Sequence, residues 1–227
     1  MEFAILKIHI KIKPIVVKIH SIAQNTQMFL FTTWAIMTTC TRTRCALRGG
    51  VSMNDTTAAQ CNDLGIQFLE INNLSDAEAM FKSAIVYKHD YVAAHTNLAL
   101  TLILEEEYGY AKEVLQKAYF LDPTNLHVHF YFGMVHAAFQ NLTLAVESFE
   151  HARCIDPSFK PATIRVGIVY LVLNETSTAV QTLQTAADDS ASGSYVKTGL
   201  YFLKLGDLEK AHWSFLQALW MHSNASF

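Results

Sequence analysis

The stretches "LALTLILEEEYGYAKEVLQKAYFLDP" (98–123) and "FGMVHAAFQNLTLAVESFEHARCIDP" (132–157) share one pattern of small, large and proline residues, displaced by 34 positions. An alanine recurs with this spacing, a large apolar residue follows four positions later, and a second alanine follows three positions after that. The first alanines are Ala77, Ala111, Ala145, Ala179 and, after 32 residues, Ala211. The large residues are Phe81, Leu115, Phe149, Leu183 and Phe215. Because steps of four and three stay on one helical face, each copy predicts a closely packed helix.

A second set of small residues lies twelve positions before the first alanines. It consists of Gly65, Ala99, Gly133, Gly167 and Gly199. Small residues at these positions predict a first helix whose backbone closely approaches the second. Pro123 and Pro157, again 34 apart, mark junctions where one unit ends, because proline lacks the amide proton that a helix interior needs. The predicted helix pairs span about 58–91, 92–125, 126–159, 160–191 and 192–225.

Local signals predict where the second helices begin. Ser75 followed by Glu78 has the spacing of a capping box, in which the two side chains cap the same helix start. In the last unit, Gly206 is placed to end the first helix and Asp207 to cap the second.

At these residues the chain resembles the tetratricopeptide repeat family, whose 34-residue helix-turn-helix units follow an L-G-x2-Y…A-x3-F…P pattern. The resemblance covers nearly all of 53–227 and implies an all-α fold, a right-handed α-solenoid of about five units. One departure is systematic, because no tryptophan occupies the family's usual first-helix position. The residues there are Cys61, His95, His129, Thr163 and Tyr195.

Residues 1–52 differ in composition from the rest of the chain. They hold seven of the seventeen basic residues and one acid, Glu2, whereas 53–227 carries nine net negative charges. Three interpretations of 1–52 stand: an organelle-targeting segment, a membrane-associated segment, or a poorly structured or mispredicted extension, with Met53 as the alternative start. The apolar run "MFLFTTWAIMTT" (28–39) is shorter than the roughly 20 residues of a membrane-spanning helix. We expect a cytoplasmic protein, with targeting through 1–52 as the alternative.

The sequence carries no signature of catalysis, so we expect no enzyme, no cofactor and no metal. It contains no G-x-S-x-G, no G-x4-G-K-[ST], no H-E-x-x-H and no G-x-G-x-x-G. Charged residues are only 16% of the chain, with net charge -3, which does not favour nucleic-acid binding.

The resemblance implies that the first helices line a concave groove that holds an extended or helical peptide. The predicted groove residues are Asn97, Leu100, Phe130, Tyr131, Met134, Ile164, Arg165, Ile168 and Lys197. This largely apolar lining favours an amphipathic helix or a hydrophobic peptide as the ligand.

One subclass of the family clamps peptide carboxylates with lysine, arginine and asparagine side chains. Asn97 matches one asparagine of that pattern, but His127 and Tyr131 occupy its third-unit basic positions, so we do not expect the clamp. Arg165 and Lys197 remain as positive charges able to orient an acidic group of a ligand.

The favoured function is a scaffold or adaptor that binds a protein partner in this groove. We also expect self-association through the C-terminal end, where no polar capping helix follows the last repeat. Trp213 is expected in the core, whereas Trp220 is either core or exposed. The alternative function is a fragment or targeting domain of a larger repeat-containing enzyme or assembly.

Overall fold

The computed structural model describes residues 53–188 and 190–225. The chain divides between Val51 and Ser52, and all the helices described below belong to the unit Ser52–Phe227. The interpretations of 1–52 concern residues outside the described part of the chain.

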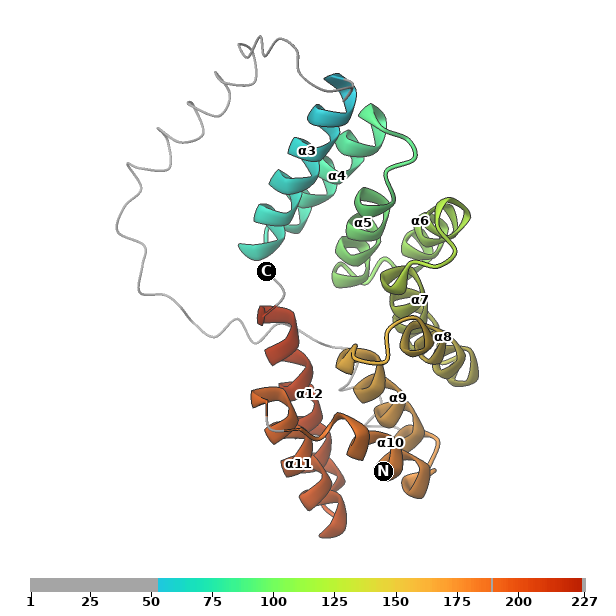
Figure 1. Cartoon of the computed structure of the whole chain (residues 1–227), viewed down its shortest axis with the longest axis vertical. Coiled ribbons are helices and arrows are strands. Elements are labelled where there is room, and N and C mark those ends of the chain that lie inside the picture. The colour runs from blue at the N-terminus through green and yellow to red at the C-terminus, as the bar shows by residue number, and fades with distance from the viewer. Residues whose placement is uncertain (1–52, 189, 226–227) are drawn as a thin grey trace, which may run out of the picture. The chain divides into compact units, whose positions relative to one another are not determined.

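The described residues form ten helices and no strand, arranged as five consecutive helix pairs. In order they are α3 (Met53–Glu70), α4 (Leu74–Tyr87), α5 (Val92–Leu104), α6 (Tyr108–Leu121), α7 (Leu126–Ala138), α8 (Leu142–Ile155), α9 (Lys160–Val172), α10 (Thr176–Ala186), α11 (Ala191–Lys204) and α12 (Leu208–Ala225). The pairs follow one another along an arc (Figure 1). The predicted all-α solenoid of about five units is confirmed.

Within a unit, a glycine of the first helix lies directly against a large side chain of the second. A Cβ atom placed on Gly133 would lie 2.5 Å from a ring carbon of Phe149, far closer than two carbon atoms can approach. The same interlock joins Gly65 to Phe81, Gly167 to Leu183, and Gly199 to Phe215. The second unit instead has Ala99 at the glycine position and the smaller Leu115 at the large one. Every unit therefore fills the same restricted space between its two helices.

We predict that Gly133→Ala destabilises the array by about 1–3 kcal/mol, because its methyl group must displace the buried Phe149 ring. Phe149→Leu in the Gly133→Ala background recreates the pair found at Ala99 and Leu115. Urea unfolding of both single variants and the double variant should give a coupling free energy of about 1 kcal/mol or more. Simple additivity of the two changes would show that the interlock does not limit helix approach.

The turn inside each unit has one residue in the left-handed region of backbone space. These residues are Asn72 (φ 59°), Glu106 (φ 65°), Gln140 (φ 63°), Asn174 (φ 63°) and Gly206 (φ 76°). In each unit, the amide of the next residue donates to the carbonyl five positions earlier, as from Glu107 to Leu102 at 2.8 Å. Such a bond after a left-handed residue is a Schellman motif, which satisfies carbonyl groups left free at a helix end. In four of the five turns the left-handed residue is not glycine, so its Cβ atom makes this conformation strained.

We predict that Glu106→Gly stabilises the array by roughly 0.5–1 kcal/mol, because glycine adopts the left-handed conformation without a Cβ clash. Glu105→Gly is the matched control, since Glu105 is right-handed helical (φ -82°) and gains nothing from glycine. Thermal unfolding followed by circular dichroism should place Glu106→Gly above the wild type and Glu105→Gly below it. The reverse order would contradict the assignment of strain to this turn.

The cores between units are shared by helices of neighbouring pairs. One cluster joins Phe81 of α4, Leu102 of α5 and Leu115 of α6 to Val135 of α7. A second joins Phe149 of α8 to the α9 side chains, and a third spans α9 to α12. Because a lone pair cannot cover its apolar faces, the units are stabilised by stacking on one another.

Two predictions concerned the start of a second helix, and one of them is wrong while the other is confirmed. Helix α4 begins at Leu74 and is capped by Asn73, whose Oδ1 accepts a hydrogen bond from the Asp76 amide at 3.4 Å. The predicted cap at Ser75 is wrong, because the turn at Asn72 brings the chain into the helix before that residue. In the last unit Gly206 does end α11, and Asp207 accepts from the Lys210 amide at 3.1 Å, as predicted.

The tryptophans of α12 lie on its outer surface. Trp213 is 56% exposed and Trp220 is 58% exposed, so the prediction of Trp213 in the core is wrong. The residues that correspond to Trp213 in the preceding units are all exposed as well: Ala79, Glu113, Glu147 and Gln181. The repeat directs this position away from the first helix in every unit, whatever residue occupies it.

Candidate functional site

The first helices of three consecutive units present side chains at equivalent positions. Asn97 of α5, Tyr131 of α7 and Arg165 of α9 are 34 residues apart, and so are Leu100 and Met134, one helical turn later. All five are half-buried. We call these five residues the first-helix surface. Lys197 of α11 holds the equivalent position in the last unit and is exposed.

Three predicted groove residues lie in the core instead. Phe130 is 9% exposed, with its ring centroid 5.2 Å from that of Phe159 and 5.5 Å from that of Phe149. Ile164 is fully buried and Ile168 is 9% exposed. The prediction that these three side chains are exposed in the groove is therefore wrong.

The physical reason is the packing of neighbouring units. Ile164 and Ile168 belong to one cluster with Leu183 of α10, Val196 of α11 and Phe215 of α12. Helix α9 is apolar around most of its circumference, and such a helix is covered on most sides. Spacing along one helix identifies residues of one face, but only the next unit decides how much of that face remains open.

Asn97 is held in place by a hydrogen bond across two units. Its Nδ2 donates to Oδ1 of Asn62 on α3 at 2.9 Å, and Asn62 is itself buried. This bond fixes the orientation of the Asn97 amide. It also links α3 to α5, the first helices of the first two units. The side chain therefore supports the edge of the first-helix surface.

Tyr131 presents a neutral phenol to this surface. Burial raises the pKa of Tyr131 to about 12, so its hydroxyl keeps its proton and remains a hydrogen-bond donor at neutral pH. Its ring stacks on His127, with centroids 6.0 Å apart and an interplanar angle of 28°. Desolvation lowers the pKa of His127 below its ordinary value of 6.5, so the imidazole is uncharged at neutral pH.

Arg165 brings a positive charge into the same surface without an internal partner. Its Nε atom is buried and has no hydrogen-bond partner in the described part of the chain. None of the ion pairs between described residues includes Arg165. Burial lowers the pKa of Arg165 to about 10, which still leaves the guanidinium charged at neutral pH. A cation removed from water and left unpaired costs stability, and an acidic group supplied from outside would offset that cost.

We predict that Arg165→Met raises the stability of the free array by about 1 kcal/mol, because methionine keeps the apolar stem and removes the unpaired charge. Arg153→Met is the matched control, because Arg153 already has Glu150 as a partner at 2.8 Å on α8. Urea unfolding should show a gain for Arg165→Met and a change within about 0.5 kcal/mol for Arg153→Met. A loss of stability in Arg165→Met would mean that the guanidinium is satisfied within the protein.

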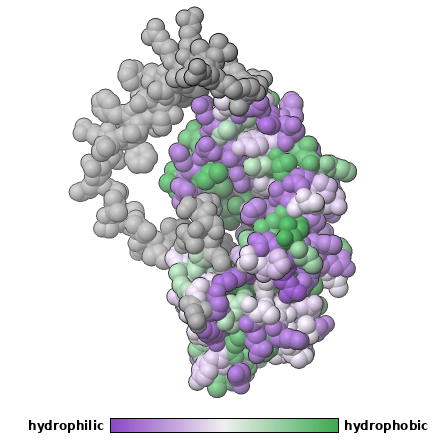
Figure 2. Space-filling model, viewed as in Figure 1, coloured by the Kyte–Doolittle hydropathy of each residue, from purple (hydrophilic) through white to green (hydrophobic). Residues whose placement is uncertain are grey.

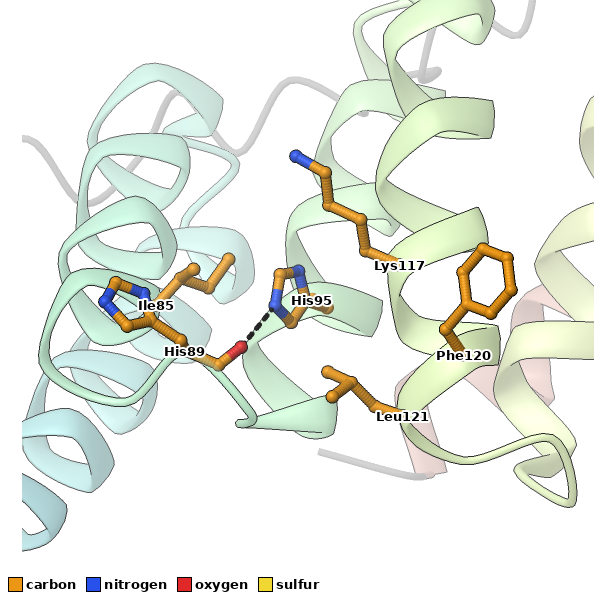
Figure 3. A pocket seen from close by; sticks show the side chains of 6 residues that line it. All are labelled: Ile85, His89, His95, Lys117, Phe120 and Leu121. Carbon is orange, nitrogen blue, oxygen red and sulfur yellow. Dashed lines mark hydrogen bonds between the residues drawn. The ribbon is translucent and has the colours of Figure 1, made fainter.

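Sequence reasoning missed a pocket between the first two units. Its volume is about 370 Å³, and its lining residues come from α4, α5, α6 and the turn after α4. They are Ile85, His89, His95, Lys117, Phe120 and Leu121 (Figure 3). A signal for it was present in the sequence, since His95 stands where the family's repeat has a tryptophan.

The described residues contain no group of three or more histidine, cysteine or acidic side chains that could hold a metal ion. None of the described helices is both long enough and apolar enough to cross a membrane. Figure 2 shows hydrophobic side chains interspersed with hydrophilic ones over the visible face of the array.

Solved structures with the same architecture are tetratricopeptide repeat (TPR) proteins. TTC0263, a thermophilic TPR protein of Thermus thermophilus, matches with a TM-score of 0.60 at 20% identity, over 71% of this chain and 90% of its own. MamA from Desulfovibrio magneticus matches with a TM-score of 0.56 at 16% identity, over 74% of this chain and 96% of its own.

A third structure is the first TPR of Spaghetti (RPAP3) bound to the HSP90 peptide SRMEEVD. It matches with a TM-score of 0.51 at 16% identity, over 53% of this chain and 98% of its own. No family model and no curated protein sequence matches the chain. The chain therefore has the fold of the tetratricopeptide repeat proteins, as its 34-residue period predicted.

Proposed function

We propose that this protein is a scaffold or adaptor without enzymatic activity, and that its first-helix surface binds a segment of a partner protein. The observation that carries the proposal is Arg165, a half-buried arginine with no acid beside it in the described part of the chain. Arginine suits this role because its planar guanidinium binds a carboxylate through two parallel hydrogen bonds. We infer that the bound segment places an aspartate, a glutamate or a terminal carboxylate against Arg165.

The rest of the surface defines the kind of segment. Leu100 and Met134 offer apolar contact, while the hydroxyl of Tyr131 offers a hydrogen-bond donor. Because Phe130, Ile164 and Ile168 are withdrawn into the core, this surface is smaller and more polar than the sequence predicted. An amphipathic helix or short peptide with a few apolar side chains and one acid fits it better than a wholly hydrophobic peptide.

The charge of the array favours selectivity at this site. Residues 53–227 carry nine net negative charges, so an acidic ligand is repelled by most of the surface. The acid is tolerated only where a positive charge compensates for it, and Arg165 is such a place. Arg165 therefore sets the register of the bound segment as well as contributing affinity.

The peptide-bound RPAP3 repeat shows that one protein with this fold holds a peptide. In the present chain, His127 and Tyr131 occupy the two positions that are basic in the carboxylate-clamping subclass, and the charge lies one unit later at Arg165. We accordingly propose a ligand that differs from the peptides of that subclass. Self-association through the C-terminal end and a cytoplasmic location remain predictions.

The test begins by capturing partners from source-cell extract with the full chain and purifying the main one. Isothermal titration calorimetry with that partner should show Arg165→Gln binding about tenfold or more weakly, because a hydrogen bond to a charged group contributes about 1.5–3 kcal/mol. Arg153→Gln should bind like the wild type, since Arg153 lies on α8 and is paired with Glu150. Equal affinity of Arg165→Gln and the wild type would place the binding surface elsewhere.

A further inference from the structure

The pocket between the first two units occupies a place that recurs at the next two junctions. Ile85, His89, His95 and Lys117 line it. Adding 34 to each number gives Tyr119, Pro123, His129 and His151 at the second junction, and adding 68 gives Arg153, Pro157, Thr163 and Thr185 at the third. The last four residues line a separate pocket at their own junction. The repeat therefore brings equivalent positions together at three junctions, with different side chains at each.

At the second junction the chain fills this place with its own aromatic rings. The ring of Tyr119 lies edge-on to His129, with centroids 5.8 Å apart, and the His129 and His151 centroids are 5.5 Å apart. The position accommodates tilted and edge-on rings when the sequence supplies them. At the first junction, Ile85 and Lys117 replace the outer two of these rings, and a pocket of about 370 Å³ remains.

The histidine that the two junctions share is anchored in the same way. Nε2 of His95 lies 3.0 Å from the His89 carbonyl oxygen, and Nε2 of His129 lies 2.8 Å from that of Pro123. A carbonyl oxygen only accepts, so Nε2 of His95 carries the hydrogen, and in the neutral ring Nδ1 is an acceptor. This Nδ1 is buried and has no partner among the described residues, and His95 is only 5% exposed. Figure 3 shows this Nδ1 atom on the side of the His95 ring that faces Lys117.

The open side of the pocket combines apolar walls with one positive charge. Phe120 is 84% exposed, the highest value among the exposed large apolar side chains of the described residues, and Leu121 beside it is also exposed. Lys117 takes part in none of the ion pairs found between described residues. In Figure 3 its side chain extends alongside the pocket, above His95 in this view.

We propose that this pocket binds an aromatic side chain of a partner protein, and that a carboxylate close to that side chain pairs with Lys117. The ring takes the place that Tyr119 and His151 occupy at the next junction and packs against Ile85, Phe120 and Leu121. An indole suits the pocket best, because it is large and mostly apolar, like the side chains of Ile85, Phe120 and Leu121 that line the pocket. The carboxylate gains a charge-assisted hydrogen bond from the Lys117 ammonium.

This surface is separate from the first-helix surface and stands independently of the proposed function. Four of its six lining residues come from the second helices α4 and α6, and none belongs to the first-helix surface. A partner could therefore contact both surfaces, or two partners could bind at once.

The test uses the full chain and N-acetyltryptophan, which presents an indole and a carboxylate, with N-acetyltryptophan amide as the uncharged probe. Nuclear magnetic resonance titration should give saturable shifts confined to the residues around Lys117 and Phe120. We expect the amide to bind at least fivefold more weakly, and Lys117→Gln to bind both probes equally weakly. His95→Trp fills the pocket from inside, so it should abolish these shifts while keeping or raising the melting temperature.

Thr163→Trp is the matched control, because it fills the equivalent pocket of the third junction and should leave the titration unchanged. The proposal is overturned if no saturable shift occurs at millimolar probe, or if His95→Trp binds N-acetyltryptophan like the wild type. Concentration-dependent self-association that both His95→Trp and Trp213→Ala abolish would instead assign the occupant to a second copy of this chain, and would overturn the separate partner.

Discussion

The contact between a small residue of each first helix and a large side chain of the second is the constraint on which the structure depends. Where glycine stands, the backbone leaves no room for even one methyl group against Phe81, Phe149, Leu183 or Phe215. This distance fixes how the two helices of a unit cross and therefore where their remaining faces point. Since each unit stacks on the faces of its neighbour, one repeated contact propagates through the whole array.

The same constraint explains why the turns tolerate strain. Five Schellman bonds of 2.8–3.0 Å end the first helices at equivalent residues. Each bond needs a left-handed residue before it, and in four of the five turns that residue is not glycine. All five helix pairs are closed by a turn of this geometry, and packing within the unit holds the backbone in it. Packing in the core thereby offsets the strain of a turn that positions the second helix against the first.

Both proposed binding sites lie where the copies of the repeat differ from one another. Arg165 holds the position of Asn97 and Tyr131 but lacks a partner, whereas Asn97 is bonded to Asn62. The junction around His95 is open, whereas the junction around His129 is filled by rings. In both places the repeat supplies the same geometry, and we propose that a change of one or two residues turns a packing position into a place for an outside group.

The sequence by itself determined the five helix pairs, the glycine contacts and the end of α11 at Gly206, because these depend on spacing within one unit. It also revealed the missing tryptophan at His95, although not the pocket that results. Only the tertiary structure decided that Phe130, Ile164 and Ile168 are buried, that Trp213 is exposed, and that Arg165 lacks a partner. The physical reason is that burial and pairing depend on the neighbouring unit, whose side chains arrive from residues tens of positions away.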